Sequence, residues 1–225
     1  MMSSQADQQR QILADMDIDV WLLREDPAAA SVASSSDSKT DLVLLQKQVE
    51  DCHNCSLAKS RTQTVFGTGN EQADLMLIGE APGAEEDRQG RPFVGKAGRL
   101  LDAMLYAIGF DRKQVFICNV LKCRPPNNRD PKSEEVEACS LFLTAQIDIV
   151  KPKVILALGR FAAHRLLHTE APVYKMRETS NVLPGTDIPV VVTYHPASLL
   201  RNPEQKAQSW RDLCKVRLLL ENPRI

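Results

Sequence analysis

Residues 79–98 read GEAPGAEEDRQGRPFVGKAG and separate two segments of different periodicity. The four residues before them, 75–78, are all apolar, as in a strand that is buried in a parallel sheet. After them, apolar side chains recur at helical spacing through residues 100–108. The stretch is therefore predicted to be a long strand-to-helix loop, and loops of this length in compact domains are typically functional. Its acids and Phe93 suit a pocket, although an acidic loop that only faces solvent has the same composition.

The rest of the chain alternates apolar runs with helical segments. Further strands are expected over residues 115–120, 154–158 and 190–193, and helices are expected to follow them and to end near residues 150, 167 and 219. Strands that alternate with helices in this way predict an α/β fold, in which a parallel sheet carries helices on both faces.

Composition places the chain among soluble globular proteins. It has 225 residues, of which 43% are hydrophobic and 25% are charged. No apolar run reaches the length of a membrane span, and the first residues lack the layout of a signal peptide. We therefore expect a cytoplasmic protein with no membrane partner. Six cysteines in such a compartment favour metal or cluster binding over disulfides.

The charge is unevenly divided along the chain. Residues 1–50 hold nine acids and four bases, so residues 51–225 hold 29 − 9 = 20 acids and 28 − 4 = 24 bases. The second part is mildly basic, at +4, which permits contact with nucleic acid without demonstrating it.

A change in composition marks a domain boundary. Residues 27–39, PAAASVASSSDSK, are rich in Ala and Ser and are expected to be a flexible linker. Residues 1–26 then form an N-terminal extension with an apolar patch around Trp21, and residues 40–225 form the main domain. The extension is expected either to dock on the main domain or to bind a protein partner, and the sequence does not decide between the two.

Polar residues follow several of the predicted strands. Glu80, Asn119 and His195 each stand at or just beyond a strand end, and Gly159 follows a further strand. In parallel-sheet folds, ligands bind beyond the carboxyl ends of the strands. A single polar residue there is more often structural, but the joint placement of three, with Phe93 nearby, predicts a functional crevice.

Four cysteines have a spacing typical of metal sites. Cys52 and Cys55 form a C-x2-C pair, and Cys123 and Cys139 follow later in the chain. From spacing alone, structural zinc and an iron–sulfur cluster are equally good interpretations. The remaining two, Cys118 in an apolar strand and Cys214 in the last helix, are expected to be buried thiols.

Three motifs occur in a specific order: the stretch of residues 79–98, then NVLKCRPPNNRDP at 119–131, then TYHPASLLRNP at 193–203. Together they resemble the family 4 uracil-DNA glycosylases, the bacterial and archaeal type that carries an iron–sulfur cluster. The resemblance covers about residues 48–215. It implies a three-layer fold with a four-stranded parallel sheet between helices. It also implies hydrolysis of the N-glycosidic bond of deoxyuridine in single- and double-stranded DNA, which leaves an abasic site.

Individual residues suit this chemistry. Phe93 can stack on a flipped base, and the side-chain amide of Asn119 can read the edge of uracil. His195 is placed to donate a hydrogen bond to uracil O2 as negative charge develops there. By resemblance, Glu86 stands against C5 and crowds out the methyl group of thymine, and Leu199 is the wedge that fills the vacated stack.

Water must be oriented differently here than in related glycosylase classes. Those classes carry a carboxylate or an amide at the position of Ala81, and that side chain aligns the attacking water. Because Ala81 has no polar side chain, the nearest acid, Glu80, is the candidate for aligning the water here. Gly79 permits tight backbone beside the base.

The resemblance also supplies further assignments. DNA phosphates are expected to contact Lys96, Arg124, Arg129 and Arg201, although any one of these residues taken singly is more often a solvated surface charge. A 4Fe-4S cluster on Cys52, Cys55, Cys123 and Cys139 becomes the favoured interpretation of the cysteine set.

Two alternatives belong to other classes. One is an inactive or partner-recruiting DNA-binding module of the same fold, which the intact Glu80, Phe93, Asn119 and His195 disfavour. The other is a related protein that traps DNA covalently through a histidine in an inserted basic loop, but residues 124–131, RPPNNRDP, contain neither insert nor histidine. We expect a monomer that acts on uracil-containing DNA.

Overall fold

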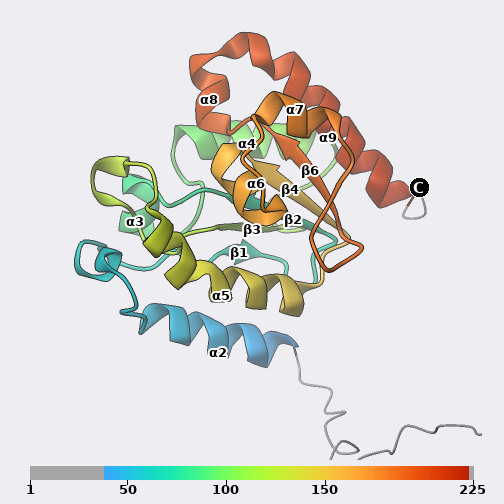
Figure 1. Ribbon diagram of the computed structural model, residues 1–225. Helices are drawn as coiled ribbons and strands as arrows, with labels where there is room; N and C mark the ends of the chain where they lie inside the picture. Colours follow the sequence, from blue (N-terminus) through green and yellow to red (C-terminus); the bar gives the residue numbers. More distant parts are fainter. Residues whose placement is uncertain (1–37, 223–225) are drawn as a thin grey trace, which may run out of the picture. The chain divides into compact units, whose positions relative to one another are not determined.

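Four parallel strands form the centre of the sheet in the computed structural model, which describes residues 38–222 (Figure 1). They are β2 (Leu75–Gly79), β3 (Phe116–Asn119), β4 (Val154–Leu158) and β6 (Pro189–Thr193). Two short strands, β1 (Thr68–Gly69) and β5 (Asn181–Val182), pair antiparallel with β3 and β6 at the two edges. The sheet therefore has six strands in the order β1-β3-β2-β4-β6-β5, and the predicted four-stranded parallel sheet is its centre.

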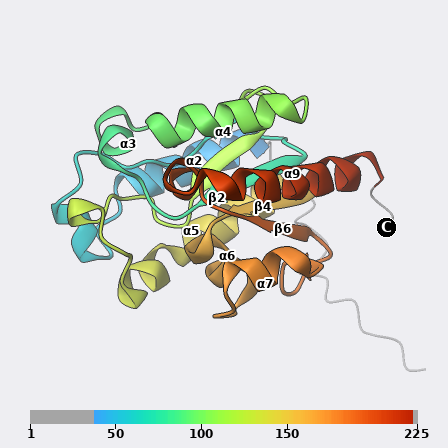
Figure 2. The same cartoon turned by 90° about the horizontal axis from the view of Figure 1, so that it is seen from above.

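Helices cover both faces of the sheet (Figure 2). One face packs against α4 (Lys96–Ala107), α8 (Pro196–Arg201) and α9 (Lys206–Glu221). The other packs against α2 (Ser38–Glu50), α5 (Ser133–Val150), α6 (Arg160–Leu167) and α7 (Val173–Glu178). Because both faces are covered, every residue of β2, β3 and β4 is buried, which explains the continuous apolar runs in the sequence. None of these helices within residues 38–222 is long and apolar enough to cross a bilayer.

Side chains alternate between the two hydrophobic layers along each strand. In β2, Leu75 and Leu77 join the layer under α4 and α9, whereas Met76 and Ile78 join the layer under α2, α5 and α6. Backbone at the end of β2 therefore lies between two packed layers, and the residue that follows, Glu80, emerges at the edge of the sheet.

The connections differ from the sequence-based expectations at several points. The stretch 79–98 contains a short helix, α3 (Ala84–Gln89), which ends at Gly90 in the left-handed conformation. Single turns of 3-10 helix occur at η1 (Ser56–Lys59), η2 (Pro126–Asn128) and η3 (Pro203–Gln205). The last of these directly precedes α9, which begins at Lys206.

Helix starts are also displaced. α2 begins at Ser38, inside the segment predicted as a linker; residues 27–37 and the predicted extension 1–26 lie outside the described residues. α5 begins at Ser133, and Glu135 in its first turn accepts a hydrogen bond from the backbone N–H of Lys132 at 2.9 Å. Cys118 is buried as expected, but Cys214 is only partly buried.

Candidate active site and four-cysteine pocket

A pocket opens at the carboxyl ends of the parallel strands, which we call the base pocket. It is lined by eight of the predicted site residues, Glu80, Ala81, Glu86, Phe93, Asn119, Arg129, His195 and Arg201, together with Pro82, Gly83, Ala97, Pro125, Asn128, Asp130 and Ala197. The structure thus brings together residues that are up to 121 positions apart, because the ends of β2, β3 and β6 meet at one edge of the sheet.

Asn119 lies at the bottom of this arrangement. It is the last residue of β3 and only 2% exposed, yet its Nδ2 has no hydrogen-bond partner among the described residues. Gly79 is its neighbour in the register of β2 and β3. A Cβ at Gly79 would lie 2.3 Å from Asn119 Oδ1 and 2.6 Å from Phe93 Cζ, so only glycine leaves room for both side chains. A buried amide donor without a partner is costly, which marks Asn119 as a group that awaits a ligand.

His195 is held as a neutral donor. Its Nδ1 accepts a hydrogen bond from the backbone N–H of Ala197 at 3.1 Å, which leaves the proton of the neutral ring on Nε2. The pKa of His195 is lowered to about 4, mainly by burial and also by the positive charge of Arg201, against the opposing effect of Glu86. The ring lies beside Phe93, with ring centroids 5.6 Å apart and planes tilted by 30°.

The carboxyl group of Glu80 is also perturbed by burial, which favours its neutral form. Burial raises the pKa of Glu80 to about 7, and the negative charge of Asp130 adds to this effect while Arg160 opposes it. Arg160 also contacts Asp130 at 3.4 Å. A carboxyl group with a pKa near neutral is suited to accept a proton at physiological pH. Asp130 stands in a quoted motif but had no assigned role, and nothing in the sequence signalled Arg160.

Glu86 organises the loop as well as lining the pocket. Its Oε1 accepts hydrogen bonds from the backbone N–H groups of Val94 at 3.0 Å and Gly95 at 3.2 Å, just before α4 begins. The carboxylate therefore has a fixed position between α3 and α4, which a purely solvent-facing acid would not have.

Leu199 does not occupy the position that the wedge role requires. It is 1% exposed and belongs to the hydrophobic layer on the α4 side, so it does not project from the surface as the expected wedge would. The next residue, Leu200, is 45% exposed. The sequence contains both leucines in a row, and only the phase of the short helix α8 decides which of them faces outward.

The four predicted phosphate ligands have different surroundings. Arg129 forks onto the buried Glu135, with Nη2–Oε1 at 2.5 Å and Nη1–Oε2 at 2.9 Å, and these bonds hold the pKa of Glu135 at about 2. This guanidinium was expected to contact a DNA phosphate. In the structure it ties the loop after β3 to α5 instead. Lys96 and Arg201 are exposed, and Arg124 is partly buried with its Nε 2.8 Å from Asn128 Oδ1. Lys96 and Arg124 lie outside the lining of the base pocket.

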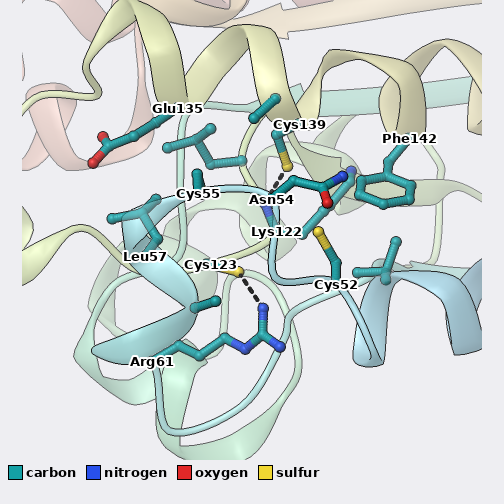
Figure 3. Close-up of a pocket in the computed structure, with 14 residues that line it drawn as sticks. Cys52, Asn54, Cys55, Leu57, Arg61, Lys122, Cys123, Glu135, Cys139 and Phe142 are labelled. Atoms are coloured by element: carbon teal, nitrogen blue, oxygen red, sulfur yellow. Dashed lines mark hydrogen bonds between the residues drawn. The ribbon is translucent and has the colours of Figure 1, made fainter.

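All four predicted ligand cysteines line a second pocket, the cysteine pocket (Figure 3). Cys52 follows α2, Cys55 precedes η1, Cys123 lies in the loop after β3, and Cys139 lies in α5. The walls are largely apolar side chains, including Val49, Leu57, Leu121 and Phe142. As the side chains stand in residues 38–222, no three His, Cys, Asp or Glu residues form a group that could hold a metal ion.

The chemistry of the cysteine pocket nevertheless fits a cationic group. Cys123 Sγ accepts a hydrogen bond from Arg61 Nη1 at 3.2 Å, and Cys139 Sγ accepts one from the backbone N–H of Lys122 at 3.3 Å. Burial raises the pKa of Cys139 to about 11 and also raises the pKa of Cys123. A bound metal supplies the positive charge that such buried thiols need to ionise, and donors already directed at sulfur favour the thiolate form.

Comparison with known proteins agrees with this geometry. Residues 66–214 match the family model of the uracil DNA glycosylase superfamily. The type-4 uracil-DNA glycosylase of Archaeoglobus fulgidus is 41% identical over 181 residues, which cover 76% of this chain and 88% of the relative. The type-4 enzyme of Sulfurisphaera tokodaii is 43% identical over 187 residues (80% and 85%), and that of Thermotoga maritima is 45% identical over 161 residues (71% and 83%). The chain therefore belongs to the uracil-DNA glycosylase superfamily and, within it, to the type-4 family.

Proposed function

We propose that this chain is a monofunctional uracil-DNA glycosylase, a repair hydrolase that cleaves the N-glycosidic bond of deoxyuridine in single- and double-stranded DNA. The observation that carries the proposal is the buried, unpartnered Nδ2 of Asn119 in a pocket that also contains Phe93. A flat base with a hydrogen-bond acceptor on its edge fills such a site, and the curated relatives are named for removing uracil.

Asn119 reads the base. Its Nδ2 donates to uracil O4 and its Oδ1 accepts from N3–H, whereas the cytosine edge presents a donor and an acceptor in the reverse order. Stacking on Phe93 contributes about 1–3 kcal/mol. Glu86, fixed by the amides of Val94 and Gly95, stands against C5 and excludes the methyl group of thymine.

His195 and Glu80 act on different parts of the reaction. Water adds its oxygen to C1′ of the sugar as the C1′–N1 bond breaks, and uracil leaves with the bonding electron pair. The Nε2–H of His195 stabilises the charge that develops on O2. Glu80, whose pKa lies near 7, takes the proton that water loses. Ala81 offers no polar side chain, so Glu80 also orients the water.

DNA contact extends beyond the base pocket. Lys96, Arg124 and Arg201 bind phosphates, which positions the strand without reading its sequence. Leu200, rather than Leu199, fills the gap left by the flipped nucleotide because it is the exposed leucine of α8.

The proposal includes a 4Fe-4S cluster held by Cys52, Cys55, Cys123 and Cys139. Bound there, the group cross-links segments that are far apart in the sequence: the end of α2, the loop after β3, and α5. Metal analysis and the visible spectrum of anaerobically purified protein test this assignment. A yellow-brown protein with iron is expected, and stoichiometric zinc without iron would contradict it.

The working unit is a cytoplasmic monomer. One copy supplies the strand ends, the loop of residues 79–98 and the helix α8 that line the base pocket, and none of the six cysteines forms a disulfide. The extension of residues 1–26 is assigned to docking or partner binding. Light scattering of the purified chain should give the mass of one copy.

The central test is uracil release from an oligonucleotide with a single uracil, followed by alkaline cleavage of the abasic site. Wild-type protein should cleave, whereas a DNA-binding module without chemistry would not. Asn119→Asp loses the donor to O4 and gains an acceptor suited to cytosine N4, so uracil release should fall sharply and weak cytosine release should appear. Asn70→Asp, an exposed asparagine outside the pocket, is the matched control. Unchanged uracil turnover in Asn119→Asp would remove Asn119 from base reading.

A further inference from the structure

The backbone of Phe93 has a conformation that non-glycine residues rarely adopt. Its φ is +52°, in the left-handed region, where a residue with a Cβ is strained. Such a conformation persists only when the surroundings hold it. The side chain that stacks on the base therefore depends on contacts that fix its own main chain.

Arg112 supplies the most direct of these contacts. Its Nη1 donates to the carbonyl oxygen of Phe93 at 2.9 Å, and its Nη2 donates to the carbonyl oxygen of Pro92. The planar guanidinium thus binds two successive carbonyls in one geometry, which a single-point cation could not reproduce. Nη1 also contacts Asp102 Oδ1 of α4 at 2.9 Å, so the guanidinium is itself anchored.

Helix α4 closes the other side of the same carbonyl. A Cβ at Gly98 would lie 1.8 Å from the carbonyl oxygen of Phe93 and 2.3 Å from its carbonyl carbon. The carbonyl is thus confined between the backbone of α4 and Arg112. At the other end of the residue, the ring lies against His195 and above Gly79. The main chain and the ring are held by different partners.

We propose that Arg112 is a positioning residue that keeps the ring of Phe93 at the stacking position for the flipped base. The inference rests on the proposed function, since it assumes that Phe93 stacks on uracil. Arg112 does not line the base pocket, so it acts through Phe93. Without the guanidinium, the peptide after Phe93 loses its anchor, the strained φ relaxes, and the ring turns away from His195.

A double-mutant cycle distinguishes an effect of Arg112 that acts through Phe93 from an effect that is independent of Phe93. Arg112→Ala, Phe93→Ala and the double variant are compared by single-turnover uracil release at a range of oligonucleotide concentrations and by inhibition with free uracil. Phe93→Ala should weaken inhibition by uracil roughly tenfold or more, which is in the range of one stacking contact. Arg112→Ala should reproduce most of that loss, and the double variant should be no weaker than Phe93→Ala.

Two further variants set the scale. Asp102→Ala, which removes the acceptor that anchors Arg112, should weaken inhibition by a few-fold. Lys113→Ala removes the exposed basic side chain next to Arg112 in the sequence, and this variant should match wild type. Where Arg112→Ala does not fold, as judged by its melting curve, Arg112→Lys takes its place and should give an intermediate loss because one donor remains.

Several results would contradict a part of the proposal. Additive losses in the double variant would overturn the inference, because Arg112 would then act independently of Phe93. Weaker DNA binding with unchanged inhibition by uracil would also overturn it and identify Arg112 as a phosphate ligand. An inactive wild-type chain would overturn the proposed function itself, whereas an active wild type with an indistinguishable Arg112→Ala would overturn this inference alone.

Discussion

The base pocket and the cysteine pocket are built on opposite principles. In the base pocket, polar groups at strand ends are left unpaired or strongly perturbed, as shown by the free Nδ2 of Asn119 and the raised pKa of Glu80. In the cysteine pocket, sulfur atoms in loops and helices already accept hydrogen bonds and the walls are apolar. Unpaired or perturbed polar groups are typical of sites that bind a substrate, whereas Cys123 and Cys139 are already held by hydrogen-bond donors within apolar walls, as in a site that stabilises the fold.

Lys122 joins the two pockets. It is 1% exposed, and its Nζ donates to the carbonyl oxygen of Asn119 and to Gln146 Oε1, both at 2.6 Å. Its backbone N–H donates to Cys139 Sγ, and the next residue is Cys123. Substitutions in the cysteine pocket, in the base pocket and at Lys122 should therefore have different effects.

The largest effect is expected in the cysteine pocket. Cys139→Ser replaces a thiolate with a poor ligand for iron, so the protein should lose its colour, its iron and much of its thermal stability. Iron content and melting temperature are the measurements. Cys118→Ser, a buried thiol outside the ligand set, should keep both colour and iron. Full iron retention in Cys139→Ser would contradict the proposed ligand set.

A change in the base pocket should have the opposite profile. His195→Ala removes one preorganised donor to the leaving base, so kcat should fall by roughly 10²–10³, about 3–4 kcal/mol, with little change in DNA affinity or melting temperature. Single-turnover kinetics measure the loss. His168→Ala, on an exposed histidine, should behave as wild type. A kcat within a few-fold of wild type in His195→Ala would leave the leaving base without its proposed donor.

Substitution of the shared residue should affect both pockets. Lys122→Met leaves the carbonyl oxygen of Asn119 and Gln146 Oε1 unpaired, at about 1–3 kcal/mol for each buried group, partly offset by removal of a buried cation. We expect a lower free energy of unfolding, weaker inhibition by uracil and faster loss of iron in a chelator. Lys113→Met is the exposed control. If stability falls while inhibition by uracil stays the same, the two pockets are not coupled through Lys122.

The smallest effect concerns Glu80 and depends on pH. The pKa of Glu80 in the folded protein, about 7, lies above its ordinary value of 4.5, so folding stability declines as pH rises through 7 and the buried carboxyl ionises. Glu80→Gln should therefore be more stable than wild type at pH 8, with a difference that disappears toward pH 5. Its turnover should be low and should lack the rise through pH 7 that is expected of wild type, in which Glu80 ionises. Normal turnover in Glu80→Gln would exclude Glu80 from the reaction.

The sequence predicted the central sheet and the gathering of Glu80, Asn119, Phe93 and His195 because both depend on local patterns. Buried parallel strands have continuous apolar runs, and parallel topology brings their ends to one edge. The edge strands β1 and β5 were missed because two residues carry no periodicity.

Features that depend on how separate elements and loops pack together could not be predicted. Arg112 and Phe93 are 19 residues apart and meet through a main-chain carbonyl, which leaves no side-chain pattern in the sequence. Leu199 was chosen over Leu200 because the rotation of a six-residue helix is set by packing. The pairing of Arg129 with Glu135 depends on how the loop after β3 folds back onto α5.

The buried Nδ2 of Asn119, which has no hydrogen-bond partner among the described residues, is a locally frustrated group in the fold. A buried donor without an acceptor costs the folded state about 1–3 kcal/mol, and correct substrate relieves that cost on binding. Under the proposed function, an apolar side chain at residue 119 should therefore stabilise the fold while abolishing base selection.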